Sequence, residues 1–289
     1  MKPYKTTPVL VERIWGGNKL CEYNKHIGRN IIGESWETGT IDKDTEILIK
    51  LIDASDILSV QVHPDNEFAL RVENAENGKS EAWVILECER DSFIIYGFNR
   101  PVQKEELRYR LEDGSIAEIL NYVKVKKGDC IYIPAGTVHS LGEGILAYEA
   151  QQPSDLTYRL YDWGRTDFSG KARELHIDKA LEAINYSFEP PGIRNIYASS
   201  AGGFSNIINC KYFQLDYRRL GHKERQGYEA GSSRAVTVIS GSVVVRFEDS
   251  LILARRGDTC IIPEDYCGVV TIEGVEDAEY IVATNREQI

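Results

Sequence analysis

One β-rich segment occurs twice in this chain, and the repeat limits the folds that the chain can adopt. Residues 127–140 read KGDCIYIPAGTVHS, and residues 256–269 read RGDTCIIPEDYCGV. Both have a Gly-Asp pair, an apolar run and a proline six residues after the glycine, which is typical of two strands joined at a turn. The repeat predicts a related β unit in each half of the chain, and chance similarity of two β-turn-β units is the alternative.

The rest of the chain favours a mainly β protein. Short apolar and β-branched runs such as EILIKLID, SFIIYGF and SVVVRF are separated by Gly, Pro, Asn and Asp, and strands at such spacing favour sandwiches or barrels. Between residues 103 and 123 the apolar residues follow helical spacing instead, and the Asp113-Gly114 pair suggests two helices that meet at a turn. Residues 174–185 also show helical spacing.

A linker divides the predicted elements into two groups. The stretch EPPGIRN, at residues 189–195, has the proline and glycine content of a connection between domains. We therefore expect a first domain at residues 1–188, with its helical segment at about 103–123. A smaller, degenerate β domain is expected at residues 196–289.

Composition disfavours several classes of function. The chain has 34 Lys and Arg against 45 Asp and Glu, a formal net charge of −11, which disfavours a nucleic-acid or anionic-membrane surface. No apolar run reaches the roughly 18 residues of a membrane-spanning helix, and the first residues lack the pattern of a signal peptide. Scattered cysteines without a CxxC pair indicate free thiols in a reducing cytoplasm, the expected location: Cys21, Cys88, Cys130, Cys210, Cys260 and Cys267.

The first copy of the repeat carries a histidine that the second copy lacks. Gly128, Pro134, Gly136 and His139 follow the spacing Gly-x5-Pro-x-Gly-x2-His. This spacing resembles the second sequence motif of the cupins, whose histidine points into a small β-barrel and binds metal. The chain is thus expected to hold two cupin-like β-barrel or jelly-roll domains, with a small helical insertion in the first half. The second copy has Gly268 where the histidine would stand, so only the first domain is expected to bind metal.

Three further residues are candidate metal ligands. Strand alternation in SVQVHP places Gln61 and His63 on one face, and Glu81 begins another apolar run. With His139 they offer two imidazole nitrogens and two oxygens, a set that suits zinc, with manganese, iron or cobalt as alternatives. Singly, such residues are more often turn histidines or solvated carboxylates, but their combination on one β frame favours a metal site.

The chain resembles the type I mannose-6-phosphate isomerases, in particular their short bacterial form. The matching motifs follow the family's order and cover roughly the first 165 residues: WGG, GESWE, LSVQVHPDNEFA, KSEAW, IPAGTVHSL and EAQQPSDLTYRLYDWGR. The resemblance implies reversible conversion of mannose 6-phosphate to fructose 6-phosphate at one zinc ion per chain. Its implied site residues are the metal ligands Gln61, His63, Glu81 and His139, the catalytic residues Arg159 and Glu149, and the substrate-binding residues Ser59, Lys79, Asp155 and Arg165.

The chemistry of these residue types agrees with an aldose–ketose isomerase. A proton must move between adjacent carbons through an enediol-type intermediate, which requires a base, stabilisation of negative charge on oxygen, and an anchor for the phosphate. Glu149 would be the base, whereas a permanently charged Arg159 stabilises the enediolate and is a poor base. The alternatives are a metal-dependent cupin acting on another sugar phosphate and a non-catalytic sugar-binding regulatory cupin. Trp83 is expected in the core, and His176 has no motif partner.

Overall fold

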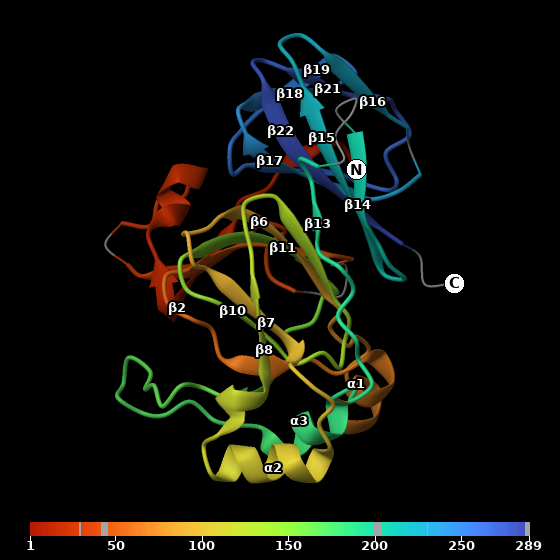
Figure 1. Cartoon of the computed structure of the whole chain (residues 1–289). Helices are drawn as coiled ribbons and strands as arrows, with labels where there is room; N and C mark the ends of the chain where they lie inside the picture. Colours follow the sequence, from red (N-terminus) through yellow and green to blue (C-terminus); the bar gives the residue numbers. More distant parts are fainter. Residues whose placement is uncertain (29, 42–45, 199–203, 230, 287–289) are drawn as a thin grey trace.

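The computed structural model describes the whole chain except residues 29, 42–45, 199–203, 230 and 287–289. Its strands form four sheets that group as two pairs, one of seven and five strands and one of six and four strands. Neighbouring strands run antiparallel. In Figure 1 the second pair lies above the first, and the α-helices lie at the opposite end of the molecule.

The first pair of sheets is built from most of the strands of the N-terminal part of the chain. The seven-stranded sheet has the order β13-β9-β6-β11-β4-β3-β2, and the five-stranded sheet has the order β12-β5-β10-β7-β8. Their bounds are β2 Val9–Gly17, β3 Ile32–Trp36, β4 Leu48–Ala54, β5 Val60–Val62, β6 Glu81–Glu87, β7 Phe93–Phe98, β8 Leu120–Lys124, β9 Asp129–Ile133, β10 His139–Leu141, β11 Ile145–Gln151, β12 Tyr158–Tyr161 and β13 Arg194–Asn195.

The second pair contains the C-terminal strands and one strand from the N-terminus. The six-stranded sheet has the order β1-β20-β17-β22-β15-β14, and the four-stranded sheet has the order β16-β21-β18-β19. Because β1 pairs with β20, the first residues lie with the second pair rather than with the expected first domain. The bounds are β1 Tyr4–Lys5, β14 Phe204–Asn209, β15 Phe213–Leu220, β16 Arg225–Tyr228, β17 Arg234–Ser240, β18 Ser242–Phe247, β19 Ser250–Arg255, β20 Thr259–Ile262, β21 Val270–Gly274 and β22 Ala278–Asn285.

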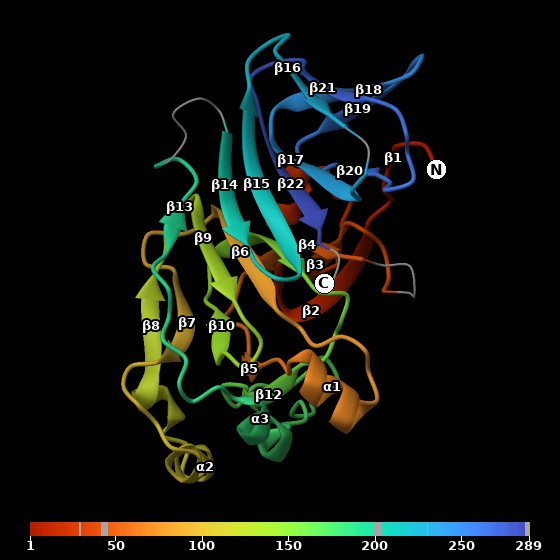
Figure 2. The same ribbon diagram turned by 90° about the vertical axis from the view of Figure 1, so that its right-hand side faces the viewer.

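In Figure 2 strands β14 and β15 of the six-stranded sheet lie next to β9 and β6 of the seven-stranded sheet. Apolar side chains fill the spaces between successive sheets. Trp83 and Ile131 of the seven-stranded sheet pack with Ile94 of the five-stranded sheet. The opposite face of the seven-stranded sheet packs on the six-stranded sheet, where Val84 and Leu215 belong to one cluster. Both faces of the seven-stranded sheet are therefore covered, which explains why every residue of β4 and of β11 is buried. The boundary expected at the linker stays a prediction, because the two sheet pairs share this core.

The helices cover the outer face of the five-stranded sheet. The helix expected at residues 174–185 is present as α3, Ile177–Ala183. The segment at 103–123 is helical only in part: α2, Lys104–Glu112, ends before the Asp113-Gly114 pair, and a 3-10 turn and β8 replace the second helix. Pairing of β8 with β7 outweighs the local helical spacing there. The remaining bounds are α1 Asn66–Glu73, η1 Lys19–Tyr23 and η2 Ile116–Ile119.

The predicted fold class is confirmed as mainly β with a small helical portion in the first half. The sheets are paired open sheets and not closed barrels, so the jelly-roll description applies rather than the barrel. Among the described residues, no helix is both long enough and apolar enough to cross a membrane.

Candidate metal centre and active-site pocket

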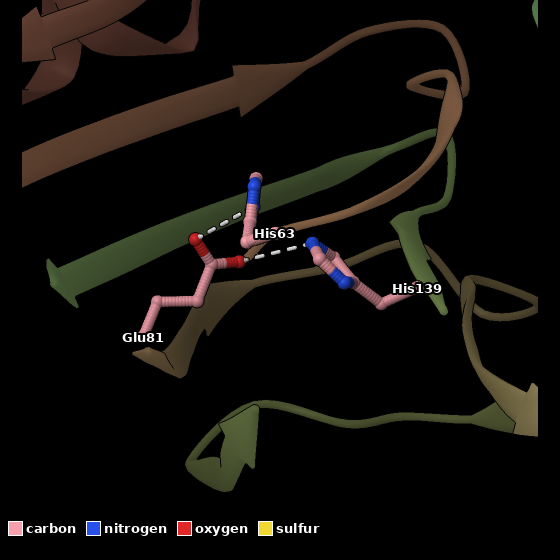
Figure 3. A group of neighbouring side chains, drawn as sticks. All are labelled: His63, Glu81 and His139. Atoms are coloured by element: carbon pink, nitrogen blue, oxygen red, sulfur yellow. Dashed lines mark ion pairs between the residues drawn. The ribbon is translucent and has the colours of Figure 1, made fainter. Parts of the chain in front are cut away.

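His63, Glu81 and His139 meet between the two sheets of the first pair, and all three side chains are buried (Figure 3). One Glu81 oxygen, Oε2, lies 3.3 Å from His63 Nε2, and the other, Oε1, lies 3.3 Å from His139 Nε2. The ligand atoms of the three residues all lie within 4.8 Å of one another. The sequence prediction for these three residues thus corresponds to a real cluster of possible ligand atoms.

Strand pairing brings residues that are distant in sequence to this centre. His139, the first residue of β10, is paired with Gln61 of β5, and Arg159 of β12 is paired with the same Gln61 on its other side. The turn before β10 is held against the end of β5, because the Gly136 N–H donates at 2.8 Å to the carbonyl of His63, the residue that follows β5. Gly136 adopts a φ of 84°, which favours glycine at this corner.

Both imidazoles direct their Nε2 atom to the centre. Nδ1 of His63 lies 2.8 Å from the Leu156 carbonyl, and Nδ1 of His139 lies 2.8 Å from the Thr137 carbonyl. A carbonyl only accepts, so each Nδ1 carries a proton, and the neutral form of each ring has its lone pair on Nε2. These carbonyls fix the ring orientations in the way that outer partners of metal-binding histidines do.

Several of the ligand atoms that face the centre have no hydrogen bond within the described residues. Within the described part of the chain, His63 Nε2 and both carboxylate oxygens of Glu81 are buried without a hydrogen bond, and Oε2 has an ion-pair contact with Lys79. The Gln61 amide lies 3.3 Å from His139 Nε2, and a half-turn of that amide directs its oxygen to the same centre. Lone pairs and a carboxylate that converge in a buried space fit a divalent cation, because a cation satisfies all of them at once.

Burial and charge set the protonation states around the centre. Burial, aided by the charge of Lys79, lowers the pKa of His63 to about 3, so the imidazole is neutral at pH 7. Burial alone would raise the pKa of Glu81, but Lys79, with its Nζ 3.0 Å from Oε2, holds that pKa well below its usual range. The centre therefore offers a neutral His63 imidazole and an ionised Glu81 carboxylate, the forms that bind metal.

A polar pocket of about 500 Å³ opens beside the centre, in the size range of small-molecule sites. It lies between the two sheets of the first pair, and Gln61 forms part of its wall. Its charged lining residues come from both sheets and from the loops beside them: Glu12, Arg13, Glu34, Lys50, Lys79, Glu149, Asp155, Arg159 and Arg173.

Glu149 of β11 faces this pocket from the seven-stranded sheet. Its Oε2 accepts from the Trp83 indole at 2.8 Å, and Lys50 Nζ lies 3.4 Å from Oε1, which has no hydrogen bond to any described residue. Burial, together with the negative charge of Glu81, raises the pKa of Glu149. A carboxylate with a raised pKa and one unsatisfied oxygen on a pocket is suited to proton transfer. Trp83, expected only to fill the core, also orients this carboxylate.

Arg159 faces the same pocket from β12. Its Nη1 donates to the Glu174 carbonyl at 2.7 Å, and its backbone N–H donates to His176 Nδ1 at 3.2 Å while its carbonyl accepts from the His176 N–H at 2.8 Å. Burial, and then the charge of Arg173, lower the pKa of Arg159. His176, which has no motif partner in the sequence, therefore holds the backbone of the arginine.

The predicted substrate-binding residues do not all reach the pocket. Ser59, Lys79 and Asp155 line it, and the Ser59 hydroxyl donates to Gln61 Oε1 at 3.3 Å. Arg165 is not among the residues that line this pocket, as far as the structure describes the chain. Its guanidinium is held by Asp162 at 2.8 Å and by Asp56 at 3.1 Å.

Sequence reasoning missed a group of charged side chains on the seven-stranded sheet. Lys50 is paired across the strands with Glu149 on one side and with Trp36 on the other. Burial alone would raise the pKa of Glu34, but the charges of Lys50 and Arg13 lower it to about 2. One signal was present, because Lys50 interrupts a fully apolar run in ILIKLID.

Fold and site together define a metal-binding, double-sheet protein of the cupin type. No family model matches the chain. It is 35% identical to mannose-6-phosphate isomerase ManA of Bacillus subtilis, with 98% of each chain covered, and 30% identical to the mannose-6-phosphate isomerase of Streptococcus mutans, over 87% of this chain and 89% of that one. The crystal structure of the Bacillus subtilis mannose 6-phosphate isomerase superposes with a TM-score of 0.87 at 30% identity, covering 98% of this chain and 99% of that one. The chain belongs to the mannose-6-phosphate isomerase family.

A more distant match agrees on the fold. A mannose 6-phosphate isomerase bound with zinc and yttrium is 15% identical and gives a TM-score of 0.74 over 99% of this chain and all, 100%, of that one. At this identity the likeness concerns the arrangement of the sheets alone. The two proteins thus share the layered fold although few of their side chains are identical.

Proposed function

We propose that this protein interconverts mannose 6-phosphate and fructose 6-phosphate with the help of a divalent metal ion. The observation that carries the proposal is the buried His63–Glu81–His139 centre, with its unsatisfied inward atoms, next to a pocket that presents Glu149. Near-complete coverage of relatives named for this reaction supports the same activity.

His63, Glu81 and His139 would hold the metal, with Gln61 as the fourth ligand. Two imidazole nitrogens with oxygen ligands suit zinc, and we propose one zinc ion per chain. When bound, the ion supplies a positive charge that orients sugar oxygens and stabilises negative charge on them. Lys79, 3.0 Å from Glu81, adds a fixed positive charge at the edge of the centre.

Glu149 is proposed to carry the proton between the two sugar carbons. Its Oε1 is free of hydrogen bonds, while Trp83 holds Oε2 and so fixes the orientation of the carboxylate. Because the pKa of Glu149 is raised, the group gives up its proton less readily than an ordinary carboxyl, and turnover is expected to fall as the pH drops through that raised pKa. Arg159, across the pocket, would stabilise the enediolate as a permanent cation.

The remaining lining residues would position the substrate. Ser59 and Asp155 lie on the pocket wall within reach of sugar hydroxyl groups. Six unpaired cysteines favour a reducing compartment, and we propose the cytoplasm. The metal-dependent reaction on a different sugar phosphate, and sugar binding without turnover, are the alternatives that the following experiment separates.

The test is a coupled assay for fructose 6-phosphate formed from mannose 6-phosphate. The protein is stripped with a chelator, its folding is checked by circular dichroism, and it is resupplied with zinc, manganese or cobalt. Activity that is lost and then returns with zinc supports both the reaction and the metal. A folded, metal-loaded protein without activity on mannose 6-phosphate would exclude the proposal, and a panel of other sugar phosphates then distinguishes the two alternatives.

A further inference from the structure

The cations around the pocket differ in how well they are neutralised. Those on or beside the seven-stranded sheet each have a carboxylate partner at 2.9 to 3.4 Å: Arg13 with Glu34, Lys50 with Glu149, and Lys79 with Glu81. At this side of the pocket positive and negative charges are therefore balanced, and a bound anion would meet carboxylates as well as cations.

The opposite side, formed by β12 and the loop after it, has an excess of positive charge. Asp162 is shared by two guanidinium groups, Arg165 at 2.8 Å and Arg173 at 2.7 Å. Among the described residues, Arg159 has no carboxylate within ion-pair distance. The buried Asp162 carboxylate thus binds two of the three arginines. The other carboxylates nearby are Asp56, whose side chain is half-exposed, and Asp155, which lines the pocket without an ion pair to any described arginine.

Arg165 uses four of its five N–H groups within the protein. Its Nε donates to the Asp162 carbonyl at 3.3 Å, its Nη2 donates to the Asp162 carboxylate at 2.8 Å, and its Nη1 donates to Asp56 at 3.1 Å and to the Ile57 carbonyl. It is also missing from the described lining of the pocket. The side chain therefore acts as a brace between Asp162 and the segment before β5.

Arg173 differs from Arg165 in both respects. It lines the pocket, and it uses only Nε and Nη2 to bind the Asp162 carboxylate, at 2.7 and 2.5 Å. Within the described part of the chain its Nη1 has no hydrogen-bond partner. The two-point contact with Asp162 fixes the plane of the guanidinium and leaves its outer edge available, which is how an arginine is presented to a phosphate.

The loop that carries Arg173 is braced by its own contacts. Thr166 and Ala172 form a β-bridge across it. At its tip the Asp167 carboxylate accepts from the Ser169 backbone N–H at 2.8 Å and from the Lys171 N–H at 3.0 Å. Arg173 is thus held in place before any ligand arrives, which reduces the entropy lost on binding.

We propose that Arg173, beside Arg159, binds the phosphate group of the sugar phosphate, whereas the family resemblance implied Arg165 as the substrate-binding arginine of this region. The inference rests on the proposed function for the identity of the substrate, but the anion site itself does not. Arg159 keeps its role toward the enediolate, and Arg173 supplies the phosphate contact. An anion here also relieves the repulsion between the two guanidinium groups.

The experiment compares the full-length, metal-loaded protein with R173A and with K171A. Lys171 lies in the same loop, is exposed and is not among the lining residues, so K171A removes an equal charge without touching the pocket. Binding of inorganic phosphate is measured by titration calorimetry, and KM is measured for mannose 6-phosphate. We expect R173A to weaken phosphate binding and raise KM by about ten- to a hundredfold, and K171A to change either by less than about twofold.

The two measurements keep the inference apart from the proposed function. If phosphate binding depends on Arg173 but the protein does not isomerise mannose 6-phosphate, the proposed function is wrong and the anion site still holds. Wild-type affinity for phosphate in folded R173A, an equal loss in K171A, or no phosphate binding by the wild type would overturn the inference. If R173A does not fold, R173K keeps the charge but not the planar fork, and an unchanged phosphate affinity in R173K then overturns it.

Discussion

The two copies of the Gly-Asp turn have the same backbone and different chemistry. Gly128 and Gly257 adopt φ values of 86° and 88°. In the first copy the Gly128 N–H donates to the Ile85 carbonyl at 2.7 Å, and in the second the Gly257 N–H donates to the Val238 carbonyl at 2.8 Å. The repeat is therefore structural and not a chance similarity.

Strand register shows what stands at equivalent positions in the two sheets. Glu81 pairs with Ile133, and in the second copy Arg234 pairs with Ile262, so an arginine occupies the place of the metal-binding carboxylate. Glu149 pairs with Trp83, and by the same register Val282 stands in place of Glu149. The turn requires only its glycine and aspartate, whereas the chemistry depends on inward residues that the second copy has replaced.

The substitution H139G would break the comparison most severely, because it gives the first copy the residue found at Gly268. Loss of one imidazole leaves the remaining ligands too few to retain the metal, so turnover is expected to fall by about a thousandfold or more. Metal content measured by mass spectrometry should fall in parallel, with the protein still folded by circular dichroism. Retention of full metal and activity would show that His139 is not a ligand.

Replacement of Glu149 by glutamine tests the second difference between the copies. E149Q keeps the shape and the contact with Trp83 but cannot accept a proton, so kcat is expected to fall by about a hundred- to ten-thousandfold. Metal content should stay at the wild-type level, because Glu149 is not a ligand. Near-normal turnover with mannose 6-phosphate would remove Glu149 from the proton-transfer step.

Alanine substitutions at the equivalent glycines, Gly128 and Gly257, test the shared backbone through the free energy of unfolding. An added Cβ at Gly257 would meet the Tyr23 carbonyl, whereas at Gly128 it would meet the ring of Tyr197, which is 40% exposed and can move. With the strain of a positive φ, we expect G257A to cost about 2–5 kcal/mol of unfolding free energy and G128A less. Gly114 is the control, since it has a φ of 79° and no neighbour within 4 Å. Equal losses in urea unfolding for all three alanine variants would contradict this order.

The sequence predicted well what is encoded in short contiguous stretches. Gly128, Pro134 and His139 lie in one short segment around β9, and Gln61 and His63 lie two residues apart, so their spacing alone indicates a shared site. The groups it missed depend on which strands are neighbours. Lys50 meets Glu149 only because β4 pairs with β11. The sequence alone does not distinguish Arg173 from Arg165. Both bind Asp162, and only the structure shows that Arg173 lines the pocket.

The smallest effect is expected from G268H, which returns a histidine to the second copy. Its imidazole would lack the carboxylate partner that Glu81 supplies in the first copy, because Arg234 stands there and repels a cation. We therefore expect metal content by mass spectrometry to stay at the wild-type level and turnover to stay within about twofold, since the first copy is untouched. A Cβ at this position would also meet the Tyr266 hydroxyl, so a modest loss of stability is expected. Acquisition of a second metal ion per chain would show that one histidine on this frame suffices, and that the loss of His139's counterpart alone separates the two copies.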